Sequence, residues 1–235
     1  MNPTLLPSLT LLAITLCGCA PWYSNRPHKS VTSHAPLPGG RKSEYTTDND
    51  PAFAQMDLRS GDIIFIAIPA IHQIAETTLC RSNHVGIVFW DPAKGWLVAE
   101  SAVPLSRYTP LKKFLARSDH GWCAIRRLRA GLTDAQITAL RTQCDARMGV
   151  PYDTGFRYGS RRQFCSKFVY DVYQSALGIH VGELETFSHL LDQNPHADVA
   201  FWRVWFFGRI PWNRLTVTPA SQFASSLLNT AWQSE

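Results

Sequence analysis

One cysteine of this sequence has the surroundings that a reactive thiol needs. Cys165 begins a segment whose apolar residues recur at helical spacing, so it is expected in the first turn of a helix. There the unpaired backbone N–H groups and the helix dipole favour a negative charge. Basic residues surround it, with no acidic residue between 154 and 170: Arg157, Arg161, Arg162 and Lys167. These features predict a lowered thiol pKa and a nucleophile; a buried, inert cysteine is the alternative.

A base and a carboxylate that could serve this thiol stand on two neighbouring expected strands. His84 opens the first of these strands, and imidazole is the natural base near neutral pH. Glu100 ends the second strand in an apolar setting, where a carboxylate needs a partner. His84 across the ladder is that partner, and Glu100 would then orient the ring. A surface histidine and an exposed strand-end glutamate are the alternatives.

The elements that must position these residues begin with a sheet. β-Branched and aromatic runs predict strands at 63–68, 84–90, 96–100 and 122–128. The turn at 91–95 joins two of them, so these two strands are expected to be antiparallel. Consecutive strands on short loops favour an α+β fold over a βαβ order.

Three helices are expected after the strands. Thr133 and Gln136 form a capping box that starts the first helix. The second helix begins at Cys165, and Gly178 ends it. A short third helix is expected at 185–191.

Three short segments together point to a known family: NHVGI at 83–87, VAES at 98–101 and QFCSKFV at 163–169. In this order they resemble the YiiX/YebB-like permuted papain-like cysteine hydrolases of the NlpC-type superfamily, most of all the YebB type. Weaker matches extend the likeness over about residues 57–222. The resemblance implies a circularly permuted papain-like fold, with an antiparallel sheet or small barrel packed against helices.

The resemblance also implies a role for each matching residue. Cys165 would be the nucleophile, His84 the base and Glu100 the third, orienting residue, in the permuted chain order. Tyr152 and Asp153 match a family segment near the site and would position the substrate.

Two further features of the helix start bear on its chemistry. The backbone N–H of Cys165 is expected to point out of the helix N-terminus, which makes it a candidate oxyanion donor. Many relatives have Glu after Cys-Ser, where this chain has Lys167. That departure predicts a more cationic helix start and puts a shared substrate in doubt.

The first residues predict a targeting signal rather than part of the folded domain. Residues 5–16 form an apolar run with the length of a signal-peptide core, too short for the ~20 residues of a membrane-spanning helix. The following Gly18-Cys19 resembles a bacterial lipobox, so residues 1–18 are expected to be a lipoprotein signal peptide and Cys19 to be lipidated. Residue 20 is Ala rather than Asp, which by resemblance to enterobacterial lipoproteins implies the outer membrane, facing the periplasm. A short membrane-proximal helix is the alternative.

Composition sets the domain plan. The chain has 235 residues, 45% of them hydrophobic and 17% charged, which excludes a disordered or fibrous chain and suits one core. Residues 19–55, rich in proline and polar residues, are expected to form a flexible tether, and 56–235 the hydrolase domain. The net charge of +5 is too small to make nucleic acid the default partner. A monomer is expected.

The six cysteines form no CxxC pair, so a structural zinc site is not expected. No other metal and no cofactor are expected. Cys144 is expected in the core, whereas a disulfide between Cys80 and Cys123 stays open. The stretch 107–129 carries a local charge of +6 and is either a solvated face or a contact for anionic lipid. The aromatic segment 201–212 is either core or a rim that touches lipid.

Three functions follow. The first is a membrane-anchored amidase or peptidase, acting on cell-wall peptides by a Cys-His-Glu triad. The second is a lipid-directed thiol acyl hydrolase or acyltransferase. The third is a non-catalytic binding lipoprotein, which an intact set of three residues disfavours. The sequence does not separate peptide from lipid substrates, because a fold does not fix a function.

Overall fold

The computed structural model describes residues 53, 55–194 and 196–234. The predicted signal peptide, Cys19 and all of the predicted tether except Phe53 and Gln55 lie outside these residues. Within the described part of the chain, no helix combines the length and the hydropathy needed to cross a bilayer.

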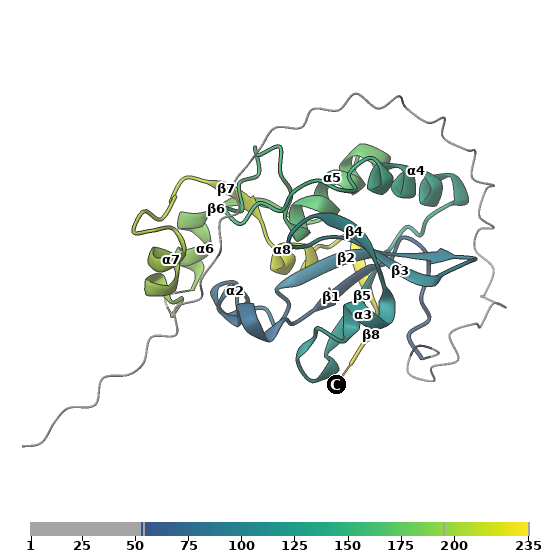
Figure 1. The fold of residues 1–235 in the computed structure, drawn as a ribbon, viewed down its shortest axis with the longest axis horizontal. Helices are drawn as coiled ribbons and strands as arrows, with labels where there is room; N and C mark the ends of the chain where they lie inside the picture. The colour runs from purple at the N-terminus through teal and green to yellow at the C-terminus, as the bar shows by residue number, and fades with distance from the viewer. Residues whose placement is uncertain (1–52, 54, 195, 235) are drawn as a thin grey trace, which may run out of the picture. The chain divides into compact units, whose positions relative to one another are not determined.

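A six-stranded sheet with the strand order β4-β3-β2-β1-β5-β8 forms the centre of the fold (Figure 1). Its strands are β1 (Ile63–Ile66), β2 (His84–Asp91), β3 (Gly95–Ser101), β4 (Ser106–Pro110), β5 (Cys123–Leu128) and β8 (Leu228–Gln233). Every neighbouring pair is antiparallel, as the sequence predicts. The four expected strands are confirmed, whereas β4 and β8 at the two edges are additions.

The two faces of the sheet carry separate apolar clusters. Because successive side chains of a strand point to opposite faces, Ile63 and Phe65 enter one cluster while Ile64 and Ile66 enter the other. The first cluster is covered by α4 (Asp134–Asp145) and α5 (Cys165–Leu177), which Figure 1 shows together on one side of the sheet. The second includes residues of α3 (Leu111–Leu115). With both faces covered, β1 is buried throughout.

The start of α4 and the end of α5 are as the sequence predicts, although α4 ends at Asp145, before the Gly149 and Pro151 that its sequence offers as a stop. Thr133 and Gln136 make the capping box at the start of α4. Gly178 closes α5 with a φ of 70°, a left-handed conformation that glycine adopts without strain. Cys144 packs in the first apolar cluster, as expected.

The remaining elements lie around these layers. They are the 3₁₀ turns η1 (Pro69–Ile71) and η2 (Asp119–Gly121), the helices α2 (His72–Thr77), α6 (Phe187–Gln193), α7 (Val199–Trp205) and α8 (Pro219–Phe223), and the antiparallel pair β6 (Leu184–Thr186) and β7 (Leu215–Val217). The helix expected at 185–191 therefore begins two residues later. Residues 184–186 pair with β7 instead, and Thr186 caps α6.

The aromatic segment 201–212 divides between core and surface. Trp202 is buried in a third apolar cluster, but Val204 and Phe207 are 79% and 95% exposed.

Arginines of the basic stretch 107–129 pair within the fold. Arg117 and Arg107 approach Glu100, and Arg127 binds the buried Asp62. These three side chains therefore pair with buried acids of the fold, and a contact of the stretch with anionic lipid stays a prediction. Cys80 and Cys123, whose pairing the sequence leaves open, are both free thiols.

Candidate active site

The residues singled out by their chemistry meet at one end of the sheet. His84 is the first residue of β2, and Glu100 lies one residue before the end of β3, its antiparallel neighbour. The helix α5 begins at Cys165, immediately after the extended residue Phe164. All three functional side chains are buried, with Cys165 4% and His84 3% exposed.

His84 and Glu100 form a short hydrogen bond. Nε2 of His84 lies 2.6 Å from Oε2 of Glu100, so the carboxylate fixes the orientation of the ring. The approach depends on Gly86, because a Cβ there would meet Val98 Cγ1 at 2.4 Å and Glu100 Cβ at 3.5 Å.

The carboxylate of Glu100 has further partners that sequence reasoning missed. The hydroxyl of Thr109 on β4 donates to Oε1 at 2.6 Å, and Arg117 donates to Oε2 at 2.7 Å. Burial raises the pKa of Glu100, but His84, Arg117 and Thr109 lower it to about 2. Glu100 is therefore ionised at neutral pH.

The thiol of Cys165 lies beside His84 and the hydroxyl of Tyr152, which both lower its pKa. Burial raises the thiol pKa, but His84, Tyr152 and the backbone N–H of Ser166 together lower it by more. The net pKa lies below the ordinary value. Because Glu100 takes Nε2 of His84, Nδ1 is the ring nitrogen left for the sulfur.

The pKa of the His84 imidazole is shifted in the opposite direction, upward. Burial lowers its pKa, but the hydrogen bonds and charges of Cys165 and Glu100 raise it to about 9. A lowered thiol pKa beside a raised imidazole pKa favours the ion pair of thiolate and imidazolium over the neutral pair.

The basic residues near Cys165 in sequence do not surround its thiol, contrary to the prediction. Lys167 turns away and binds Asp171 at 2.5 Å, so it does not make the thiol's surroundings more cationic. Arg157, Arg161 and Arg162 are exposed. The prediction that these cations activate the thiol is therefore wrong, and the lowered pKa comes chiefly from His84 and Tyr152.

Tyr152 and Asp153, the two residues expected to bind substrate, differ in where they point. The Tyr152 hydroxyl contacts both the sulfur and the backbone N–H of Cys165. Its segment is held by the N–H of Tyr152, which donates to Pro104, and by a bridge to Gln163. Asp153 instead accepts the N–H of Gly155 at 2.8 Å and stabilises its own loop.

The C-terminal part of the chain holds the start of α5 in place. The Ser166 hydroxyl donates to the Val217 carbonyl at 2.7 Å. The buried Gln222 of α8 donates to the Ser166 and Val181 carbonyls at 2.9 and 3.2 Å. These distant contacts carry no sequence signal.

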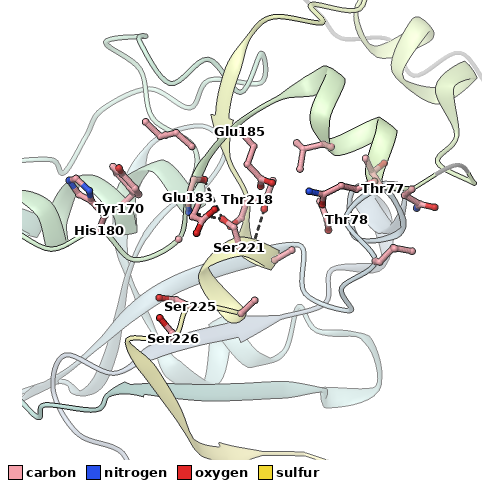
Figure 2. Close-up of a pocket in the computed structure, with 18 of the residues that line it drawn as sticks. Thr77, Thr78, Tyr170, His180, Glu183, Glu185, Thr218, Ser221, Ser225 and Ser226 are labelled. Atoms are coloured by element: carbon pink, nitrogen blue, oxygen red, sulfur yellow. Dashed lines mark hydrogen bonds between the residues drawn. The ribbon is translucent and has the colours of Figure 1, made fainter.

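A cavity of about 810 Å³ lies apart from this site. Figure 2 shows Glu183, Glu185, Thr218 and Ser221 among the residues that line it. Tyr170 of α5 contributes to its wall, but Cys165, His84 and Glu100 do not. We therefore place the chemistry at the thiol rather than in this cavity.

A nucleophile-type cysteine at a helix start, facing a histidine on an antiparallel sheet, defines a papain-like thiol site. Here the histidine strand precedes the cysteine helix, which is the permuted order. The chain belongs to the family described as permuted papain-like amidase enzymes of the YaeF/YiiX type, C92 family, whose model matches residues 57–231.

Relatives extend this assignment. The chain is 31% identical over 182 residues to the uncharacterized protein YiiX of Escherichia coli K12, covering 77% of this chain and 88% of YiiX. A crystal structure of YiiX from Escherichia coli O157:H7, described as a metalloprotein, matches with a TM-score of 0.67 and 30% identity. That match covers 75% of this chain and 97% of the other. The permuted papain-like fold is thus confirmed, while closeness to the YebB type stays a prediction.

Proposed function

We propose that this protein is a membrane-anchored cysteine amidase that cleaves an amide bond with Cys165, His84 and Glu100. The observation that carries the proposal is the buried set of three residues, in which the Cys165 thiol lies beside His84 and the His84 ring is hydrogen-bonded to Glu100. A thiolate, a protonated imidazole and an orienting carboxylate are the parts that acyl transfer needs.

Acylation begins when the Cys165 thiolate attacks the carbonyl carbon of the amide. The sulfur–carbon bond forms as the carbonyl electrons move onto oxygen. The backbone N–H of Cys165 and the hydroxyl of Tyr152 lie beside the sulfur and stabilise this oxyanion. His84 then donates its proton to the departing amine, which leaves a thioester on Cys165.

Deacylation reverses the role of His84. The neutral ring takes a proton from water, and the resulting hydroxide attacks the thioester carbonyl. The carbon–sulfur bond breaks, releasing the carboxylic acid and restoring the thiolate beside the imidazolium. Glu100 holds the ring in one orientation throughout and stabilises its charged form.

The substrate we favour is a peptide of the bacterial cell wall. The expected lipid on Cys19 would tether the enzyme to the outer membrane, facing the periplasm, where such peptides are found. Several acyl chains make a stable anchor, because each buried CH₂ contributes about 0.8 kcal/mol.

One observation favours a second substrate class, acyl chains of lipids. Val103 and Leu105 are 65% and 41% exposed, and they flank Pro104, whose carbonyl accepts the Tyr152 N–H. An exposed apolar loop beside the site suits an acyl group as well as an apolar peptide side chain. A lipid acyl hydrolase or acyltransferase is therefore the alternative.

The description of the YiiX crystal structure as that of a metalloprotein raises the question of a metal in this chain. Among the described residues of this chain, no three His, Cys, Asp or Glu side chains gather as a metal site would require. The residues around Cys165 therefore do not fit a metal centre, and no step above uses one.

Two measurements test the proposal. Iodoacetamide, followed by peptide mass spectrometry, should label Cys165 faster than Cys80, Cys123 or Cys144, and His84→Ala should slow that labelling. Incubation with muropeptides and with phospholipids, analysed by mass spectrometry, separates the two substrate classes. Cleavage should fall at least about 1000-fold in Cys165→Ala. Equal labelling of all four thiols, or full activity without Cys165, would refute the mechanism.

A further inference from the structure

We propose that Arg117 is a positioning residue that acts through Glu100 to keep the imidazolium of His84 acidic enough to give up its proton. This inference rests on the proposed function, because it concerns the proton that His84 passes to the leaving group.

Arg117 and His84 bind the same carboxylate oxygen. Nη2 of Arg117 lies 2.7 Å from Oε2 of Glu100, and Nε2 of His84 lies 2.6 Å from that oxygen. The two cations are therefore neighbours on one acceptor. Glu100 has no exposed side-chain surface and the Arg117 side chain is 29% exposed, so water screens this pair less than it screens a pair on the surface.

The charges alternate along this chain of contacts. Arg117 is positive, Glu100 negative, His84 positive and Cys165 negative. Without Arg117 the buried group would carry a net charge of −1 and would hold the proton on His84 more tightly. With Arg117 the carboxylate is shared, which weakens its hold on the imidazolium.

The residues before and after Arg117 hold it next to Glu100. It follows α3, whose Phe114 packs near the His84 ring, with centroids 5.6 Å apart. The Arg117 guanidinium lies over that same Phe114 ring at 4.9 Å. The next residue, Ser118, accepts the Ala67 N–H at 3.1 Å and donates to the Trp122 carbonyl, which fixes the segment after α3.

Among the other groups that face His84 and Glu100 is a second cation, with which Arg117 can be compared. Glu100, Cys165 and the nearby Tyr152 come from β3, α5 and the loop before α5. β4 contributes Thr109 and Arg107. Arg107 is a second cation, but its Nε lies 3.8 Å from the Glu100 carboxylate and its side chain is 40% exposed. It is therefore the matched control for a cation that is farther away and better screened.

A merely structural role for Arg117 predicts the opposite result from ours. If Arg117 only held Glu100 in place, removing it would release the carboxylate, and the His84 pKa would fall toward its ordinary value. If Arg117 competes electrostatically, removing its charge raises the His84 pKa, because Glu100 then stabilises only the imidazolium.

The test is a pH titration of His84 in the full chain by ¹⁵N NMR of histidine-labelled protein, with the resonance assigned by comparison with His84→Ala. We expect Arg117→Gln to raise the His84 pKa by about one unit, Arg107→Gln to raise it less, and Arg117→Lys to leave it near the wild-type value. An unchanged or lowered His84 pKa in folded Arg117→Gln would overturn the inference.

Two controls keep the outcomes separable. If circular dichroism shows that Arg117→Gln does not fold, Arg117→Lys decides, and a shift of about one unit in that charge-conserving variant overturns the inference. Selective iodoacetamide labelling of wild-type Cys165 is measured in parallel. If that labelling is absent, the proposed function fails whatever Arg117 does.

Discussion

At the scale of single residues, the site works by pairing charges that burial alone would suppress. A buried thiol and a buried imidazole each tend to stay neutral, as the effect of burial on both pKa values shows. Their mutual contact, and Glu100 behind the ring, reverse both tendencies. The reactive state is thus a property of the set and of no one member.

Tyr152 offers the first prediction at this scale. Burial and the nearby Cys165 raise its pKa, so the hydroxyl stays protonated and can donate to the thiolate and to an oxyanion. Tyr152→Phe should raise the Cys165 pKa, measured from the pH dependence of alkylation, and lower kcat about 100-fold once a substrate is known. Tyr158→Phe removes a hydroxyl from the same loop and should change neither. An unaltered thiol pKa in Tyr152→Phe would show that its hydroxyl does not act on the sulfur.

Glu100 gives a prediction about stability and pH. A carboxylate whose folded pKa is lowered stabilises the protein above its unfolded value of 4.5, and this contribution fades as pH falls toward the folded value of about 2. Glu100→Gln should therefore lose about 3 kcal/mol of unfolding free energy at pH 7, and less than about half of that at pH 3. Urea denaturation measures both, with the exposed Glu183→Gln as control. A loss that is independent of pH would contradict the lowered pKa.

At the scale of elements, the pairing of β2 with β3 sets the distance between His84 and Glu100. Gly86 allows this close pairing, because an added Cβ would meet Val98 Cγ1 at 2.4 Å and the Ala99 backbone oxygen at 2.9 Å. Gly86→Ala should destabilise the protein by about 1–3 kcal/mol in thermal or urea unfolding. Gly159→Ala, where a Cβ meets nothing within 4 Å, should be near neutral. Equal stability of the two variants would mean that the strands can separate without cost.

The elements also show what a sequence can and cannot predict. The buried strands and α5 are readable because their apolar spacing is local. β4 and β8 are not, since SRYTP and LNTAWQ lack a clear alternation and owe their form to pairing with β3 and β5.

Contacts within the site that depend on the tertiary fold are likewise not predictable from the local sequence. The role predicted for Lys167 is wrong because residues two apart on a helix point to different sides, which sends its side chain to Asp171 instead of toward Cys165. Arg117 and Thr109 reach Glu100 only through the tertiary fold, so their roles carry no local signal.

At the scale of the whole molecule, apolar side chains on both sides of the predicted boundary at residue 56 pack into the core. Phe53 packs against the second apolar cluster, in which Met56 and Leu58 are buried. Asp57 accepts hydrogen bonds from Arg127, which also binds the buried Asp62. Phe53, Met56 and Leu58 therefore pack with the folded unit, although the sequence around them shows no periodic pattern.

This packing leads to a prediction from two truncations that differ by seven residues. A chain starting at residue 53 keeps the Phe53, Met56 and Leu58 contacts and should melt cooperatively, close to the full-length protein. A chain starting at residue 60 exposes the apolar surface that Met56 and Leu58 cover, and burial of each such side chain contributes about 1.5–3 kcal/mol. The shorter chain should therefore lose at least about 3 kcal/mol of unfolding free energy in urea. If both truncations unfold at the same urea concentration, residues 53–58 are a dispensable extension, and the domain begins at the turn before β1.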